Sequence, residues 1–262
     1  MKNNIIAIIC LLLSTLPLFL SAQSEKKSGE FYQITVYHFS NADQQKLIDT
    51  YLKDAYLPAL HRHSVKSVGV FIPISNDTAA DKKIYVLLPV KSLKQLTELT
   101  GKIAKDFEFL AKGKEYIDAV YDKPAFSRIE NIWLKAFPLA PFMTLPALKS
   151  SAAEKVYELR SYESTSQKIF ENKMKMFNEG GEITLFKRLN FNAVFYASVI
   201  AGSKMPNLMY MTSFENMADR DAHWKTFVAD PEWKTLSAMP EYQHNVSKND
   251  IVLMRATPYS DY

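Results

Sequence analysis

The chain has 262 residues with 32 lysines and arginines against 28 aspartates and glutamates, which gives a formal net charge of +4. This balance offers no electrostatic argument for nucleic-acid binding, because the lysines are scattered rather than clustered. The single cysteine, Cys10, excludes an internal disulfide, and the seven glycines form neither a GxGxxG nor a GxxxxGKS/T pattern, which disfavours a phosphate-binding loop.

Residues 1–22 are predicted to be an export signal. Lys2 supplies a positive start, an apolar run follows from Ile5 to Leu20, and Ser21-Ala22-Gln23 offers a small-residue cleavage point. A retained anchor is disfavoured, because the run is shorter than the roughly 20 apolar residues that a spanning helix needs. We therefore expect an exported protein, in a bacterial periplasm or secreted, that meets a membrane only through this segment before cleavage.

Residues 30–136 alternate between strand-like and helix-like apolar patterns. Strands are expected at about 31–39, 65–74, 84–90 and 127–136, and helices at about 43–63, 92–111 and 113–121. Pro58 should kink or end the first helix, and Ser92 is a candidate N-cap of the second. The resulting order, β-α-β-β-α-β, is that of the ferredoxin-like fold.

The same pattern repeats after a proline-rich linker at 137–153. In residues 154–258, strands are expected at about 155–163, 191–200, 208–215 and 249–257, and helical regions at about 165–188 and 217–239. Asn216 and Asp230 are candidate N-caps, so the second helical region should consist of two helices that break at residues 229–230. The sequence therefore predicts an α+β fold of two tandem ferredoxin-like units.

Each unit would leave one face of its sheet bare, at a cost that a small unit can hardly sustain. We therefore expect the two sheets to pair within the chain as a dimeric α/β barrel. Polar alternate positions of the strands are expected to face the shared space, where a partly wet cavity would accommodate them. These positions are Gln33, Thr35, Tyr37, Glu158, Arg160, Tyr162, Asn192, Tyr196, Ser198, Tyr210 and Thr212.

Three segments of the second half resemble the NIPSNAP family of the dimeric α/β-barrel superfamily. They are Val156-Tyr-Glu-Leu-Arg-Ser-Tyr162, the stretch from Glu182 to Arg188, and Ala222-His-Trp-Lys-Thr-Phe-Val-Ala-Asp-Pro-Glu-Trp233. The likeness covers roughly 154–258. The first half has Tyr32-Gln-Ile-Thr35 in place of the tyrosine-glutamate-leucine-arginine signature. The resemblance implies the barrel architecture, whereas superfamily relatives range from cofactor-free monooxygenases to haem-degrading enzymes and dehydratases.

Two polar groups are candidates for a site. Arg160 could bind an anionic ligand through its guanidinium fork while Glu158 accepts a proton, with Tyr162, Asn192, Tyr196 and Tyr210 as further ligand-binding residues. The alternative is an ion pair that fixes packing, with the tyrosines as packing residues. His223 could act as a general base or haem ligand, or could simply cap the rim, and a metal pair at His61 and His63 is disfavoured.

Three functions remain open from the sequence. The favoured one is a binding protein for a small, partly apolar or anionic ligand, without a firm catalytic role, metal or cofactor; haem is a less favoured ligand. The second is a cofactor-free monooxygenase or lyase in which His223 or Glu158 moves a proton. The third is a protein-interaction scaffold with a filled interior. Further association of the chain into a homo-oligomer also remains open.

Overall fold

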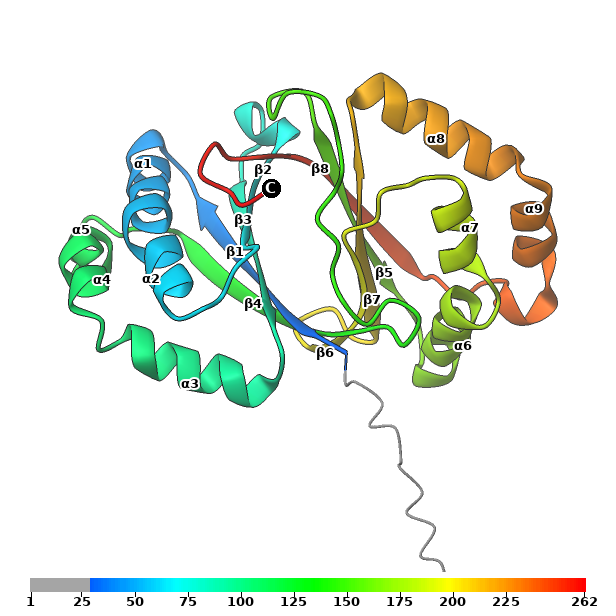
Figure 1. The fold of residues 1–262 in the computed structure, drawn as a ribbon, viewed down its shortest axis with the longest axis horizontal. Coiled ribbons are helices and arrows are strands. Elements are labelled where there is room, and N and C mark those ends of the chain that lie inside the picture. The colour runs from blue at the N-terminus through cyan, green and yellow to red at the C-terminus, as the bar shows by residue number, and fades with distance from the viewer. Residues whose placement is uncertain (1–28) are drawn as a thin grey trace, which may run out of the picture.

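The computed structural model describes residues 29–262, which form a closed eight-stranded barrel with helices packed on its outside (Figure 1). The predicted export signal lies outside the described residues. Two β-α-β-β-α-β units follow one another in the chain and close their sheets on each other, which confirms the predicted fold class. Among residues 29–262, no helix is both long enough and apolar enough to cross a membrane.

The N-terminal unit follows the predicted order, but the helices expected at 43–63 and 92–111 are each divided, the second at residues 104–106. Its elements are β1 (Phe31–Phe39), α1 (Ala42–Thr50), η1 (Tyr51–Tyr56), α2 (Leu57–Arg62), β2 (Gly69–Pro73), η2 (Ile74–Asp77), β3 (Lys82–Val90), α3 (Leu93–Ile103), α4 (Phe107–Lys112), α5 (Lys114–Ile117) and β4 (Arg128–Ala136). The π-helical segment η1 separates α1 from α2, and Pro58 lies in the first turn of α2. Proline has no N–H for the preceding turn, so the regular α-helical ladder is interrupted there.

The C-terminal unit repeats this order. Its elements are β5 (Val156–Glu163), α6 (Gln167–Asn178), α7 (Glu182–Arg188), β6 (Phe195–Ala201), β7 (Asn207–Phe214), α8 (Met217–Ala229), α9 (Pro231–Ala238), η3 (Pro240–Tyr242) and β8 (Lys248–Ala256). The expected helix at 165–188 is two helices, because Gly181 adopts a φ of +98° between them. The predicted caps are confirmed: Asn216 accepts from the N–H of Asp219, and Asp230 accepts from that of Glu232.

The strand order around the barrel is β1-β3-β2-β8-β5-β7-β6-β4. The first strand of each unit forms long ladders within its unit: β1 pairs with β3 from Phe31 to Phe39, and β5 pairs with β7 from Val156 to Glu163. The two junctions between the units are short: β2 meets β8 only at residues 254–256, and β4 meets β6 only from Trp133 onward. The N-terminal parts of β4 and β8 therefore lack a strand across the junction, and the barrel wall opens at that end.

Three apolar cores account for the packing. One lies between the N-terminal sheet and its helices, one lies between the C-terminal sheet and its helices, and the third fills the barrel between the two sheets. Met143 of the linker and Tyr262 near the C-terminus pack on the barrel core, and the Tyr262 ring lies 5.2 Å from that of Phe71. These two side chains therefore cover one end of the barrel, opposite the end where β4 and β8 separate.

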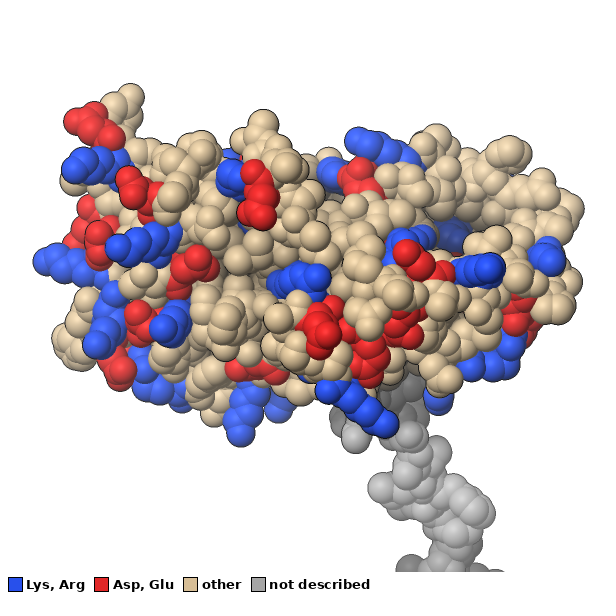
Figure 2. All heavy atoms as spheres, turned by 90° about the horizontal axis from the view of Figure 1, so that it is seen from above, with Lys and Arg blue, Asp and Glu red and all other residues tan. Residues whose placement is uncertain are grey.

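Acidic and basic side chains are mixed over the face of the molecule shown in Figure 2. Lysines and arginines alternate with aspartates and glutamates, and neither sign forms a continuous patch on that face. Any charge-based selectivity on this face is therefore expected from a local cluster rather than from the face as a whole.

Candidate functional site

The polar row on β5 does not face the barrel interior. Tyr157 and Leu159 belong to the barrel core, so the alternate residues Glu158, Arg160 and Tyr162 point toward the helices of the C-terminal unit. The expectation that this row faces the shared space is therefore wrong. The barrel interior is mainly apolar, and α8 carries the charged partners that the row needs. The other strand residues expected in the shared space also lie on the helix-covered faces of the sheets, because their neighbours in each strand form the barrel core. They are Gln33, Thr35, Tyr37, Tyr196, Ser198, Tyr210 and Thr212.

Glu158 has no exposed surface, and its carboxylate accepts hydrogen bonds from three side chains. The donors are Arg160 Nε at 2.5 Å, Arg220 Nε at 2.7 Å, Arg220 Nη2 at 3.1 Å and Trp224 Nε1 at 2.9 Å. Burial by itself raises the pKa of Glu158, but these donors and the charge of Arg160 bring it below its ordinary value of 4.5. The buried carboxylate is therefore ionised and joins β5 to α8.

Arg160 is engaged on every side by protein groups. Its guanidinium carbon lies 3.6 Å from the centre of the Trp224 ring, and its Nη1 donates to the Tyr162 hydroxyl at 3.0 Å. The Tyr162 and Tyr210 hydroxyls are 2.9 Å apart. A guanidinium that pairs with Glu158 through Nε, donates to Tyr162 through Nη1 and lies over the Trp224 ring is suited to fixing the packing of the unit, which is the alternative that the sequence left open.

A second buried ion pair lies between α6 and α7. Lys173 Nζ donates to Glu182 Oε2 at 2.9 Å, and the same ammonium lies 4.8 Å from the centre of the Phe177 ring. Burial raises the pKa of Glu182 and outweighs the opposing effect of Lys173. The two buried glutamates of this unit are thus shifted in opposite directions.

His223 and Asn192 lie away from the barrel interior. His223 Nδ1 is 2.9 Å from the carbonyl oxygen of Asp219, and the ring packs against Phe191 and Phe214 on the outside of the sheet. Asn192 is exposed in the turn before β6. Neither residue lines the cavity described below.

His61 and His63 are held by different carboxylates. His61 Nε2 is 3.0 Å from Asp261 Oδ2, and His63 Nε2 is 3.7 Å from Asp106 Oδ2. Within the described part of the chain, no group of three or more histidine, cysteine, aspartate or glutamate side chains is arranged to hold a metal ion.

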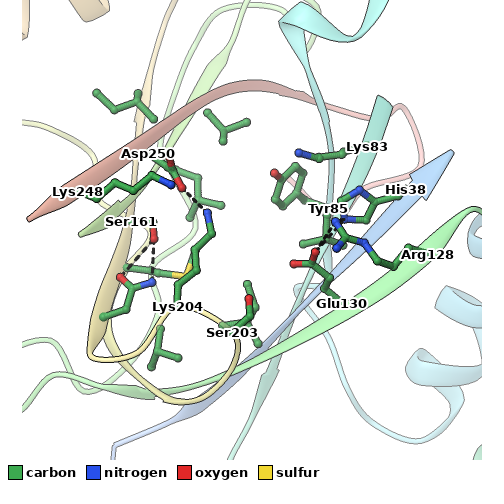
Figure 3. Close-up of a pocket in the computed structure, with 18 residues that line it drawn as sticks. His38, Lys83, Tyr85, Arg128, Glu130, Ser161, Ser203, Lys204, Lys248 and Asp250 are labelled. Carbon is green, nitrogen blue, oxygen red and sulfur yellow. Dashed lines mark hydrogen bonds and ion pairs between the residues drawn. The ribbon is translucent and has the colours of Figure 1, made fainter. Parts of the chain in front are cut away.

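A cavity of about 420 Å³ opens at the end of the barrel where β4 and β8 separate, and we call it the barrel-mouth cavity (Figure 3). Its inner wall is apolar, and its rim carries charged groups from both units. The apolar residues include Val36, Ile132, Leu159, Val199, Met209 and Val252, and the charged or titratable residues are His38, Lys83, Tyr85, Arg128, Glu130, Lys204, Lys248 and Asp250. Polar and apolar surfaces thus meet in one concave site between the two units.

His38 is the most confined titratable group of the barrel-mouth cavity, with 3% of its surface exposed. Its Nδ1 lies 2.8 and 3.0 Å from the two carboxylate oxygens of Asp81. Its Nε2 lies 3.3 Å from Arg128 Nη2 and 3.4 Å from Glu130 Oε1, and Arg128 and Glu130 pair with each other at 2.7 Å. Although burial raises the pKa of Asp81, hydrogen bonds from His38 and Lys83 lower it overall.

The C-terminal unit forms the opposite wall. Ser161 and Asn207 exchange hydrogen bonds at 2.9 and 3.2 Å, and Lys204 pairs with Asp250 on the rim (Figure 3). The hydrogen bond and charge of Lys204, followed by the charge of Lys248, lower the pKa of Asp250. The Asp250 carboxylate is therefore ionised near neutral pH.

The sequence reasoning missed His38 and its partners. One pattern in the sequence points to His38. Tyr32, Ile34 and Val36 share the face of β1 that lies in the barrel, and His38 is the next alternate residue on that face. Asp81 gave no comparable indication, because it lies 43 residues away in the turn before β3.

Comparisons with known proteins support the architecture. The NIPSNAP family model matches residues 157–261. Among curated proteins, none matches the sequence.

Solved structures similar to the whole chain include a proposed monooxygenase from Lactobacillus acidophilus, with a TM-score of 0.56 and 11% identity over 87% of this chain and 94% of the other. A proposed monooxygenase from Fusobacterium nucleatum has a TM-score of 0.57 and 5% identity over 87% and 93%. An anthrone oxidase-like protein has a TM-score of 0.53 and 9% identity over 88% and 93%. At these identities the likeness shows the fold alone.

Proposed function

We propose that the chain, whose residues 157–261 match the NIPSNAP family model, binds a small anionic molecule with an apolar body in the barrel-mouth cavity. The observation that carries the proposal is the cavity of about 420 Å³ with an apolar inner wall and a rim rich in cations. Pockets that hold small ligands measure about 300–1,000 Å³, and a few polar groups in them orient the ligand.

The charges of the cavity favour an anion. Four lining residues are cationic, namely Lys83, Arg128, Lys204 and Lys248, and two are anionic, namely Glu130 and Asp250. Their difference of two positive charges lies beside the low-dielectric barrel core, where charge interactions are stronger than in bulk water. An anionic group would therefore lie at the rim, and the apolar body would extend toward Leu159 and Met209.

An apolar core fills the barrel, as the scaffold alternative expects, but the barrel-mouth cavity leaves room for a small ligand and so favours a binding role. A cofactor-free monooxygenase or lyase remains the second candidate. The observation in its favour is His38, a buried histidine that lines the same cavity and has a carboxylate on its Nδ1.

Binding is tested by calorimetric titration of the protein without its first 22 residues with octanoate and phenylacetate, alongside their neutral analogues octanol and phenylacetamide. We expect saturable binding of the two acids and weaker binding of the neutral analogues. In the Lys204→Ala, Lys248→Ala double variant, affinity for the acids should fall by roughly ten- to a hundredfold, because a hydrogen bond to a charged group contributes about 1.5–3 kcal/mol.

The matched control is Lys225→Ala, which removes a lysine from α8 outside the cavity. Its affinity for both acids should equal that of the unchanged protein. Equal affinity of acids and neutral analogues, or an equal effect of the Lys225 and rim substitutions, would contradict the proposal.

We also propose that the chain is exported, with cleavage after Ala22. The positive start, apolar run and small residues of the first 23 positions support this. Mass spectrometry of the mature N-terminus, after expression in a bacterium and separation of the periplasm, tests it. A chain that keeps its first 22 residues in the cytoplasm would contradict it.

A further inference from the structure

We propose that His38 is a general base that removes a proton from the carbon next to the carbonyl of a small 2-oxo acid bound in the barrel-mouth cavity. The inference rests on the proposed function, since the same cavity binds the acid. It adds a reaction, carbanion formation without a metal or redox cofactor, and a substrate class.

Asp81 fixes the tautomer of the imidazole. A carboxylate can only accept a hydrogen bond, so the Nδ1 of His38, 2.8 Å from Asp81 Oδ1, carries the proton. The lone pair of the neutral ring is then on Nε2, the atom next to Arg128 and Glu130. A carboxylate that orients the ring in this way also stabilises the imidazolium that forms when the base takes up a proton.

The pair Arg128–Glu130 satisfies His38 in both protonation states. When the ring is neutral, Arg128 Nη2 donates to Nε2 at 3.3 Å; when the ring is protonated, Nε2 can donate to Glu130 Oε1 at 3.4 Å. The Arg128 side chain is 60% exposed, so it can leave Nε2 when the carbonyl oxygen of a substrate takes its hydrogen bond. The lone pair of Nε2 is then free to accept a proton, and Glu130 remains beside the ring to accept from the imidazolium.

The lining of the cavity fits a 2-oxo acid with an apolar substituent. Lys204 and Lys248 stand across the opening from His38 and can hold the carboxylate (Figure 3). The apolar wall, with Leu159 and Met209, takes the substituent. The carbonyl oxygen would then lie toward Arg128.

The reaction balances with these groups alone. The C–H bond breaks, its proton goes to Nε2 of His38, and its electron pair forms a carbon–carbon double bond while the carbonyl becomes an enolate oxygen. Arg128 donates a hydrogen bond to that oxygen. In heavy water the proton on Nε2 exchanges with a solvent deuteron, and return of that deuteron from His38 to carbon regenerates the 2-oxo acid with deuterium in place of hydrogen.

The experiment follows this exchange in phenylpyruvate by proton NMR in heavy water, with saturation-transfer spectra of the same samples reporting binding. We expect the protein to accelerate loss of the C3 proton signal, and His38→Gln to bind phenylpyruvate while losing at least a hundredfold of the acceleration, in the range that general-base catalysis contributes. His223→Gln, which alters a histidine outside the cavity, should exchange as the unchanged protein does.

Asp81→Asn provides a second variant, because the Asp81 side chain is 55% exposed and its replacement leaves the core intact. Asp81 is a positioning residue: its substitution should lower the exchange rate at saturating phenylpyruvate by roughly tenfold or more and leave the concentration for half-maximal rate unchanged. Binding without accelerated exchange, or exchange that survives His38→Gln, would overturn the base assignment and leave the proposed function intact. Absence of binding would overturn both.

Discussion

The Nε atom of Arg220 lies 2.7 Å from Oε2 of Glu158, so a contact between residues 62 positions apart fastens α8 to β5. Arg160 and Trp224 complete the set of donors around the same carboxylate. This network covers the outer face of the C-terminal sheet, while the barrel-mouth cavity lies on its inner face. Strand β5 therefore carries the packing network on its outer side and part of the proposed binding site on its inner side.

Removing the carboxylate should destabilise the fold. In Glu158→Ala, the guanidiniums of Arg160 and Arg220 lose their shared acceptor while Arg160 remains largely buried. Breaking a buried pair typically costs about 3–5 kcal/mol, and we expect a loss of this order in the free energy of unfolding measured with urea. Arg188→Ala, at an exposed ion pair on α7, is the control and should change little. Equal effects of the two substitutions would refute the structural role of Glu158.

The two buried glutamates should give opposite pH dependences. The pKa of Glu158 is lowered in the fold, so its stabilisation is complete above the ordinary value of 4.5 and is lost as the pH falls through the folded pKa. The pKa of Glu182 is raised by burial, so its contribution is complete below 4.5 and declines as the pH rises through its folded pKa.

Urea denaturation between pH 3 and pH 8 measures this difference. In Glu158→Gln, the free energy of unfolding should fall less as the pH is lowered below 4.5. In Glu182→Gln, it should fall less as the pH is raised above 4.5. The same change of slope in both variants would show that the two carboxyls are not shifted in opposite directions.

The N-cap of α8 should contribute measurably to stability. The side-chain oxygen of Asn216 accepts from the N–H of Asp219 at 3.0 Å. Asn216→Ala should lower the free energy of unfolding by about 1 kcal/mol, and Asn216→Ser, which retains a capping oxygen, should lower it by much less. Equal losses in the two variants would mean that the cap is not the cause.

Filling the cavity should abolish binding at a smaller cost to the fold than overpacking a core without a cavity. Val199→Phe places a larger side chain in the barrel-mouth cavity, whereas Val86→Phe overpacks the core between the N-terminal sheet and its helices. Calorimetric titration with octanoate should show binding lost only in the Val199 variant. Thermal unfolding should show the larger destabilisation in the Val86 variant, since overpacking a filled core costs about 1–3 kcal/mol. Retained octanoate affinity in Val199→Phe would contradict the cavity assignment.

The fold class and the order of the strands and helices could be predicted from the sequence. Period-2 and period-3.6 patterns located the strands and helices, and the capping residues Ser92, Asn216 and Asp230 marked helix starts that the structure confirms. The repetition of one unit predicted the closure of the two sheets. The division of the helix at Gly181 was missed, because a glycine within a helical pattern does not reveal that its φ is positive.

The orientation of the strand faces could not be predicted in the same way. Val156, Tyr157, Glu158 and Leu159 are all buried, because β5 has the barrel on one side and helices on the other. Alternation separates two faces of such a strand without saying which one faces the barrel. The sequence does not show that Arg220 is a partner of Glu158, because only the packing of α8 brings the two residues together. This contact determines that Glu158 faces the helices.

The most direct test of the account is methyl NMR of protein labelled at its methionine methyl groups and titrated with octanoate. Met209 lines the barrel-mouth cavity, and Met176 is buried in the helix-covered layer near the Lys173–Glu182 pair. The account predicts a saturable shift of the Met209 resonance, assigned through Met209→Leu, with no shift of Met176. A shift of Met176 with none at Met209 would place the ligand on the other side of the sheet and contradict the account.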